Sequence, residues 1–146
     1  MIRRSITTIL ILTAVSLTCG CQKAYVNADL QGTWESQDHT LNSRGKTLTN
    51  KKLVLTVDED SMVTGESGWV AVQGEGGHDG SRPAKRATEN ILGAFDPETG
   101  TFYLVETEEN GFIHGKMIDH DEIKVFLVQT GVKPVVSSTR MSRVDK

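Results

Sequence analysis

The sequence predicts an all-β domain in which about eight antiparallel strands run up and down and close into a small barrel. Three observations support this prediction. Apolar and polar residues alternate in many short segments, turn-forming residues separate these segments, and no ten-residue segment shows a helical stripe of apolar residues. Closing hairpin-linked strands into a barrel removes exposed sheet edges, although an open or sandwiched sheet is also compatible with the pattern.

The expected strands follow from period-two alternation with β-branched and aromatic residues. In the third of them, Val63, Trp69 and Ala71 share one parity and therefore one face. Acidic and glycine-containing turns separate the strands, and Asn110-Gly111 is expected to supply the positive φ angles of a tight hairpin. The expected strands are residues 30–36, 52–58, 62–73, 89–96, 102–106, 111–118, 122–129 and 135–144.

Two connections are longer than hairpin turns. Residues 38–51 are polar and are expected to link the first two strands, and residues 74–88 contain four glycines. Long loops in compact domains are usually functional or disordered, so residues 74–88 are either a flap over the barrel mouth or a floppy insertion. In this segment His78, Arg82, Lys85 and Arg86 are the candidate ligand-binding residues. The three basic residues suit an anion such as a lipid headgroup or a glycan, and His78 with Asp79 suits a cation or is a solvated loop residue.

The amino terminus has the features of a secretory signal. Arg3 and Arg4 precede an apolar run at residues 6–17, which is too short to span a bilayer. The following Leu17-Thr18-Cys19-Gly20-Cys21 resembles a lipobox, the cleavage motif of bacterial lipoproteins. This resemblance implies lipidation of Cys21 and, because Gln22 follows, retention at the outer membrane facing the periplasm.

Three segments follow from this interpretation: a signal peptide at residues 1–20, a lipidated end and short tether at 21–29, and one barrel domain at 30–146. Cleavage removes Arg3 and Arg4, so 14 basic and 19 acidic residues remain and the net charge changes from −3 to −5. An acidic domain without an extended basic patch is unsuited to nucleic acid. Once Cys21 carries lipid, no cysteine remains for a disulfide.

Gly32-Thr33-Trp34 on the first strand, with Arg140 or Arg143 on the last, resembles the signature of the calycin superfamily, which includes lipocalins and avidins. The resemblance implies a barrel in which the tryptophan closes one end and the arginine packs across its ring. The biotin-site residues of avidins do not carry over. In kind, a lipid-anchored small barrel also resembles the lipoproteins that inhibit lysozymes, although those carry disulfides.

No catalytic or metal-binding constellation is evident, so we expect neither an enzyme nor a cofactor. Gly65-Glu66-Ser67-Gly68-Trp69 lacks the second glycine of a nucleophile elbow. The densest group of possible metal ligands, at residues 119–122, occupies an expected turn, where acidic residues are ordinary. The carboxylates Glu106, Glu108 and Glu109 are expected at a solvated hairpin end, which offers no pocket.

We therefore expect a membrane-anchored envelope lipoprotein that acts as a non-enzymatic binding module. Under the first hypothesis, the barrel mouth takes a small or amphiphilic ligand. Under the second, the loops bind an envelope or lytic enzyme as an inhibitor does, and under the third the protein is structural. An eight-stranded barrel is just wide enough for one small ligand or for its own side chains, so a filled lumen favours the second hypothesis and an open one the first.

Overall fold

Eight strands form one closed antiparallel barrel, which confirms the predicted fold class. The computed structural model describes residues 24–145 except 75, 80 and 81. Around the barrel the order is β1-β10-β9-β8-β7-β6-β3-β2. The barrel strands are β1 (Gly32–Asn42), β2 (Gly45–Val57), β3 (Met62–Gln73), β6 (Arg86–Asp96), β7 (Thr101–Glu106), β8 (Gly111–Met117), β9 (Glu122–Gln129) and β10 (Val135–Arg143).

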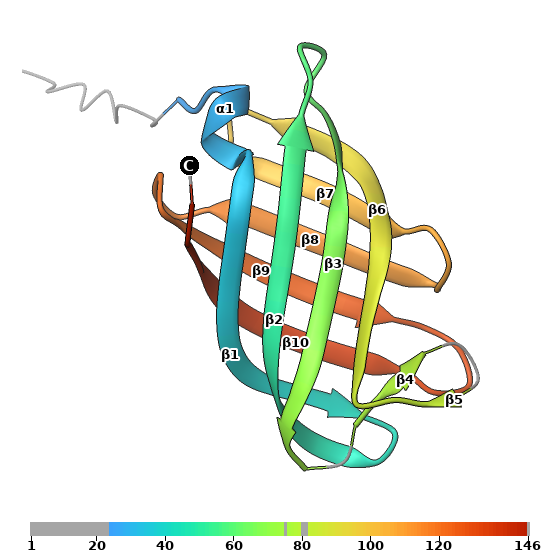
Figure 1. The fold of residues 1–146 in the computed structure, drawn as a ribbon. Coiled ribbons are helices and arrows are strands. Elements are labelled where there is room, and N and C mark those ends of the chain that lie inside the picture. Colours follow the sequence, from blue (N-terminus) through green and yellow to red (C-terminus); the bar gives the residue numbers. More distant parts are fainter. Residues whose placement is uncertain (1–23, 75, 80–81, 146) are drawn as a thin grey trace, which may run out of the picture.

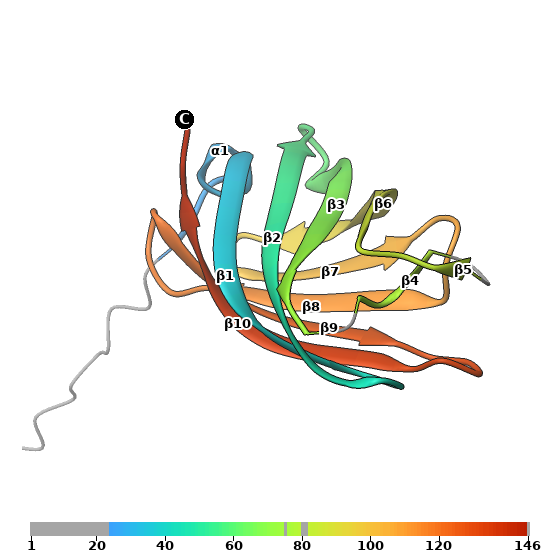
Figure 2. The ribbon, with the colours of Figure 1, turned by 60° about the horizontal axis from the view of Figure 1, so that its bottom comes forward.

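Two smaller elements lie at opposite ends of the barrel. The helix α1 (Asn27–Leu30) precedes β1, and a two-stranded hairpin of β4 (His78–Asp79) and β5 (Arg82–Pro83) lies between β3 and β6. Figure 1 shows α1 and the carboxyl terminus at one end and the β4–β5 hairpin at the other, and Figure 2 shows the same separation after a rotation. We call the α1 end the closed end and the hairpin end the mouth.

Successive side chains of each strand point alternately into the lumen and to the outer surface, so residues at every second position are generally more buried than their neighbours. In β7, Phe102, Leu104 and Glu106 are buried, whereas Tyr103 and Val105 are about half exposed. The same alternation runs through β8, where Gly115 leaves the space that the Phe102 ring occupies. A Cβ atom on Gly115 would lie 1.9 Å from Cζ of Phe102, so a large and a small residue are matched across the two strands.

The prediction of a polar connection at residues 38–51 is wrong. Strands β1 and β2 continue through this segment, pair from Gly32–Leu55 to Asn42–Gly45, and meet in a turn at Ser43-Arg44. The alternation is present, but the buried positions here hold Thr40, Thr47 and Thr49 rather than apolar residues. A pattern based on hydrophobicity alone therefore missed the lumen-facing side of these extensions.

The prediction that Asn110-Gly111 supplies the positive φ angles of a tight turn is also wrong. Neither residue has a positive φ angle in the structure. A Cβ atom at position 111 would instead lie 1.6 Å from Oε2 of Glu106, so a larger residue here would force the Glu106 carboxyl group to move. The hairpin end therefore holds a carboxylate inside the barrel rather than in solvent.

The chain before β1 packs on the closed end. Leu30, expected to begin the first strand, ends α1 and is fully buried. Tyr25 is 8% exposed, its N–H donates to the carbonyl oxygen of Pro97 at 3.0 Å, and its ring lies beside Gly100. The part of the predicted tether from Tyr25 onward thus lies on the barrel, while the predicted signal peptide and Cys21 lie outside the described residues. Among the described residues, no helix has the length and apolarity needed to cross a membrane.

Candidate functional site

The lumen divides into an apolar half and a polar half. At the closed end its lining is a packed apolar core, whereas toward the mouth many of the inward residues are polar or charged. The apolar half contains Leu30, Trp34, Leu53, Leu55, Val57, Val63, Ile91, Phe95, Phe102, Leu104, Ile113, Met117, Ile123, Val125 and Met141. Only the mouth half is therefore a candidate ligand site.

Hydrogen-bonded threonines line one wall of the mouth half, on β1 and β2. The hydroxyl oxygens of Thr40 and Thr49 lie 3.0 Å apart, and Asn42 Nδ2 donates to Thr47 Oγ1 at 3.2 Å. Thr49 Oγ1 also donates to the carbonyl oxygen of Asp38 at 3.1 Å. These buried polar groups satisfy one another, which removes most of the cost of burying them.

Lys51 and Trp69 form the next part of the wall, opposite each other on β2 and β3. Lys51 Nζ donates to the carbonyl oxygen of Asp38 at 3.0 Å. Burial lowers the pKa of the Lys51 ammonium, and the nearby carboxylate of Asp38 opposes this change. The backbone at Gly77 covers the indole of Trp69, since a Cβ atom there would lie 3.4 Å from the ring.

The space left between these groups is a cavity of about 50 Å³. A water molecule takes roughly 30 Å³ in the liquid, so the cavity holds one or two waters as it stands. A larger ligand would have to move the Gly77 backbone off Trp69. The cavity is lined by Thr40, Asn42, Thr49, Lys51, Gly68, Trp69, Gly77, Leu127, Gln129 and Val135.

Two carboxyl groups are buried in the mouth half, Glu89 on β6 and Glu106 on β7. Glu89 is 7% exposed, and its Oε2 atom has no hydrogen-bond partner. Burial, followed by the negative charges of Glu106 and Glu109, raises the pKa of Glu89 to about 7. Burial also raises the pKa of Glu106, against the effect of Gln129, whose Nε2 donates to Glu106 Oε2 at 2.7 Å.

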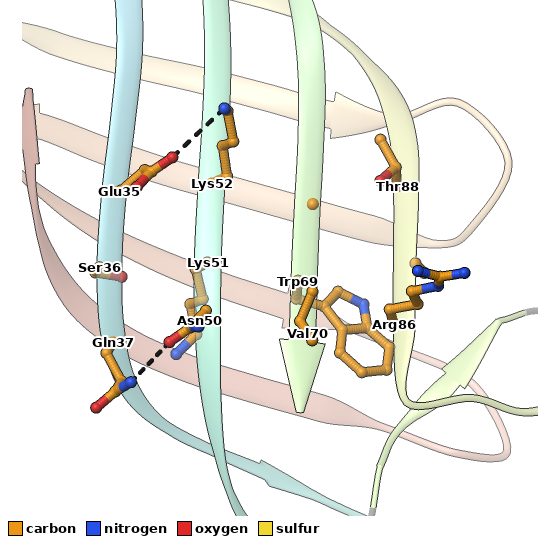
Figure 3. A pocket seen from close by; sticks show the side chains of 12 residues that line it. Glu35, Ser36, Gln37, Asn50, Lys51, Lys52, Trp69, Val70, Arg86 and Thr88 are labelled. Atoms are coloured by element: carbon orange, nitrogen blue, oxygen red, sulfur yellow. Dashed lines mark hydrogen bonds and ion pairs between the residues drawn. The ribbon is translucent and has the colours of Figure 1, made fainter. Parts of the chain in front are cut away.

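A groove of about 770 Å³ adjoins this region (Figure 3). It crosses β1, β2, β3 and β6, and Gly68 leaves part of its floor without a side chain. An ion pair between Lys52 and Glu35 at 3.4 Å and a hydrogen bond from Gln37 to Asn50 at 2.8 Å line it. Lys51, Gly68 and Trp69 line both the groove and the mouth cavity, so the two spaces adjoin at these residues.

The loop residues predicted to bind a ligand lie in and next to the β4–β5 hairpin, and their role in binding stays a prediction. The structure describes only the backbone of His78 and Arg82, which lie in the paired strands β4 and β5. Lys85 and Arg86 are exposed, and Arg86 begins β6 and lines the groove rather than the lumen. The described part of the segment does lie at the mouth, where Ala84 N–H donates to the Gly77 carbonyl oxygen at 3.0 Å.

At the closed end, Arg143 is the arginine that lies over Trp34, with its guanidinium carbon 4.1 Å from the ring centroid. Gly32 lies beside it, and Nε1 of Trp34 donates to the carbonyl oxygen of Leu30 at 3.0 Å. Arg140 points outward and pairs with Glu122. These residues close the barrel and offer no ligand contact.

The candidate site residues that sequence analysis missed are Lys51, Glu89 and Glu106. The placement of Glu106 at a solvated hairpin end is wrong, because the residue is 9% exposed inside the barrel. The alternation of side chains along a strand could have indicated that these two carboxylates face the lumen. Glu89 shares a strand face with Ile91, and Glu106 shares one with Leu104. In the described part of the chain, no three His, Cys, Asp or Glu side chains gather into a metal site.

No protein-family model matches this sequence, and no curated protein matches it. Among solved structures, the chain is similar to one described as "Structure of EF1p2_mFAP2b bound to DFHBI", with a TM-score of 0.52 and 10% sequence identity. The match covers 80% of this chain and 94% of that chain. At this identity the likeness shows the barrel fold alone, and DFHBI is a ligand of that protein.

Proposed function

We propose that this chain is a lipid-anchored envelope protein that binds a small ligand at the mouth of its barrel without catalysing a reaction. The observation that supports the proposal is the polar half of the lumen, in which a buried polar atom has no hydrogen-bond partner. Trp69 and the partly buried Lys51 line its cavity, and elsewhere in this half the buried Oε2 atom of Glu89 lacks a partner. A purely structural barrel gains nothing from this arrangement, because an unsatisfied buried polar group costs about 1–3 kcal/mol.

Two further facts support the proposal. The fold is shared with a protein whose structure is described as bound to a small molecule. The Leu17–Cys21 segment supports export and a lipid anchor, and at most about 14 Å of extended chain separates Cys21 from the barrel contact at Tyr25. The mouth lies at the other end of the barrel from this contact, so a ligand would enter from the periplasm rather than from the bilayer.

Native mass spectrometry tests the proposal. The mature chain from Gln22 contains the whole described barrel and would be exported to a periplasm and purified gently. We expect a reproducible additional mass, lost in Trp69→Leu and kept in Val70→Ala, whose side chain is the adjacent outward one on β3. A clean apo mass from the host that makes the protein, or an adduct that survives Trp69→Leu, would count against binding at the mouth.

A role in binding another protein is the second candidate, favoured by an exposed apolar row on the outer face. Leu92, Val105, Phe112, Val128, Val136 and Leu41 lie opposite one another in turn, across β6, β7, β8, β9, β10 and β1. Each is between 41% and 56% exposed, and contiguous apolar surface is typical of interaction sites. Replacing Phe112 and Val128 by threonine should abolish a protein complex and leave a mouth ligand in place, which separates the two functions by chemical cross-linking and native mass measurement.

A further inference from the structure

The Oε2 atom of Glu89 is buried without a hydrogen-bond partner, and this indicates which kind of group the mouth lacks. The side chain projects from β6 into the lumen, on the same strand face as the buried Ile91. One hydrogen bond reaches its carboxyl group, from the backbone of Glu109, and Oε2 receives none. A carboxylate oxygen accepts hydrogen bonds and donates none, so the missing partner is a hydrogen-bond donor.

The charges around Glu89 favour a donor that is positively charged. Glu106, Glu109 and Glu108 all act on it with negative charge, and none of them can donate a hydrogen bond when ionised. The Gln129 amide donates to Glu106. The adjacent cation in the lumen wall is Lys51, which lies on β2 beyond β3 and donates to the Asp38 carbonyl oxygen.

Trp69 provides the other half of a recognition surface once a ligand displaces the Gly77 backbone, which covers its indole. Residue 69 lies opposite Ala87, and Glu89 is the next lumen-facing residue along β6, opposite Ser67. Such diagonal neighbours on one sheet face are within reach of each other when one of them is aromatic. An indole face attracts cations and apolar groups, whereas it gives nothing to an anion.

We propose that the mouth takes a small organic cation, with its ammonium group on the Glu89 carboxylate and its apolar or aromatic body against Trp69. This inference rests on the proposed function and names the class of its ligand. The bound ammonium completes the hydrogen bonding of Oε2 and offsets the clustered negative charge.

The test compares three probes of similar shape: 2-phenylethylammonium, 2-phenylethanol and phenylacetate. Binding is followed by the NMR signal of the Trp69 indole N–H in the mature chain. The Trp34 indole, which is fully buried and bonded to Leu30, provides an internal control for unfolding. At pH 8 we expect the ammonium to bind at least about tenfold more tightly than the alcohol, a difference of about 1.4 kcal/mol, and the acid to bind most weakly.

Two variants separate the specific effect of Glu89 from general charge. Glu89→Gln should remove the preference for the ammonium, whereas Glu66→Gln, which removes an exposed carboxylate from β3, should retain it. At pH 5.5 the preference should shrink in the wild type, because Glu89 is then protonated. An unchanged preference in Glu89→Gln would overturn the assignment.

The outcomes also distinguish this inference from the proposed function. If the alcohol or the acid binds as tightly as the ammonium, the mouth is a binding site and the cationic class is wrong. If no probe shifts the Trp69 signal but native mass spectrometry finds a ligand lost in Trp69→Leu, the cationic class again fails and the binding function stands. If neither experiment detects binding, both are wrong.

Discussion

Glu89 shows how a single side chain can reveal an incomplete site. Buried carboxylates in stable proteins are paired or hydrogen-bonded, since burying an isolated charge is costly. Glu89 has one hydrogen bond, negative neighbours and a pKa raised to about 7 from its ordinary 4.5. Without a ligand the protein therefore holds a proton at this residue at moderately acid pH and loses it near neutrality.

This titration predicts a pH-dependent effect of Glu89→Gln on stability. Between pH 4.5 and 7 the folded wild type keeps a proton that the unfolded chain has lost, so its free energy of unfolding falls as pH rises through this window. Glutamine has no such titration. Because the mouth admits water, we expect the variant to be more stable by only about 1–2 kcal/mol at pH 8 and equal at pH 4, measured by urea unfolding. A variant that is less stable than the wild type at pH 8 would show that the charge is paired.

The site was harder to predict from sequence than the fold, for a reason visible at Thr40, Lys51 and Glu89. Each lies on the lumen face of its strand, yet none is hydrophobic, so a search for apolar alternation passes over them. Parity could have placed Glu89 and Glu106 beside apolar residues. The missing partner of Glu89 Oε2 depends on distant strands, and no sequence pattern contains that information.

At the scale of elements, β3, β6, β7, β8 and β9 could be predicted because most of their lumen-facing residues are apolar or glycine. The extensions of β1 and β2 and the short α1 could not. The extensions bury threonines, and α1 is a single turn whose formation depends on packing at the closed end. Arg143 provides much of that packing, since it joins α1, β1 and the turn before β9.

Loss of the Arg143 side chain should therefore loosen several elements together. Its guanidinium lies over Trp34 and donates to the carbonyl oxygens of Asp29, Gln31 and His120. Arg143→Ala leaves these acceptors unpaired and should cost about 2–4 kcal/mol in thermal or urea unfolding. Arg140→Ala removes only the outward pair with Glu122 and should change stability by less than about 1 kcal/mol. Equal effects of the two substitutions would contradict this role of Arg143.

At the scale of the whole molecule, the two ends of the barrel differ in the residues that they bury. The closed end holds the apolar core and the start of the described chain, whereas the mouth holds the polar half of the lumen. With an acylated Cys21, the closed end would face the membrane and the mouth would face away (Figure 1). The fold itself would then set the direction from which a ligand approaches.

This orientation can be measured by NMR on the lipidated protein bound to vesicles that carry nitroxide-labelled headgroups. Paramagnetic broadening should be strong for the amides of Gly100 and His120 at the closed end and weak for those of Arg44 and Gly131 at the mouth. The unlipidated chain with the same vesicles should show no such gradient. A gradient that is strongest at Gly131 would place the mouth at the membrane and contradict the proposed arrangement.

The barrel closes by pairing its first strand with its last, so that Trp34 lies opposite Arg143 and Asn42 opposite Val135. During synthesis, β1 therefore has an unpaired edge until β10 has emerged. A nascent chain shortened before Val135 cannot finish folding, however complete its other hairpins are, and its open edge invites aggregation or degradation. The order of the strands thus makes synthesis of β10 the condition for a closed barrel.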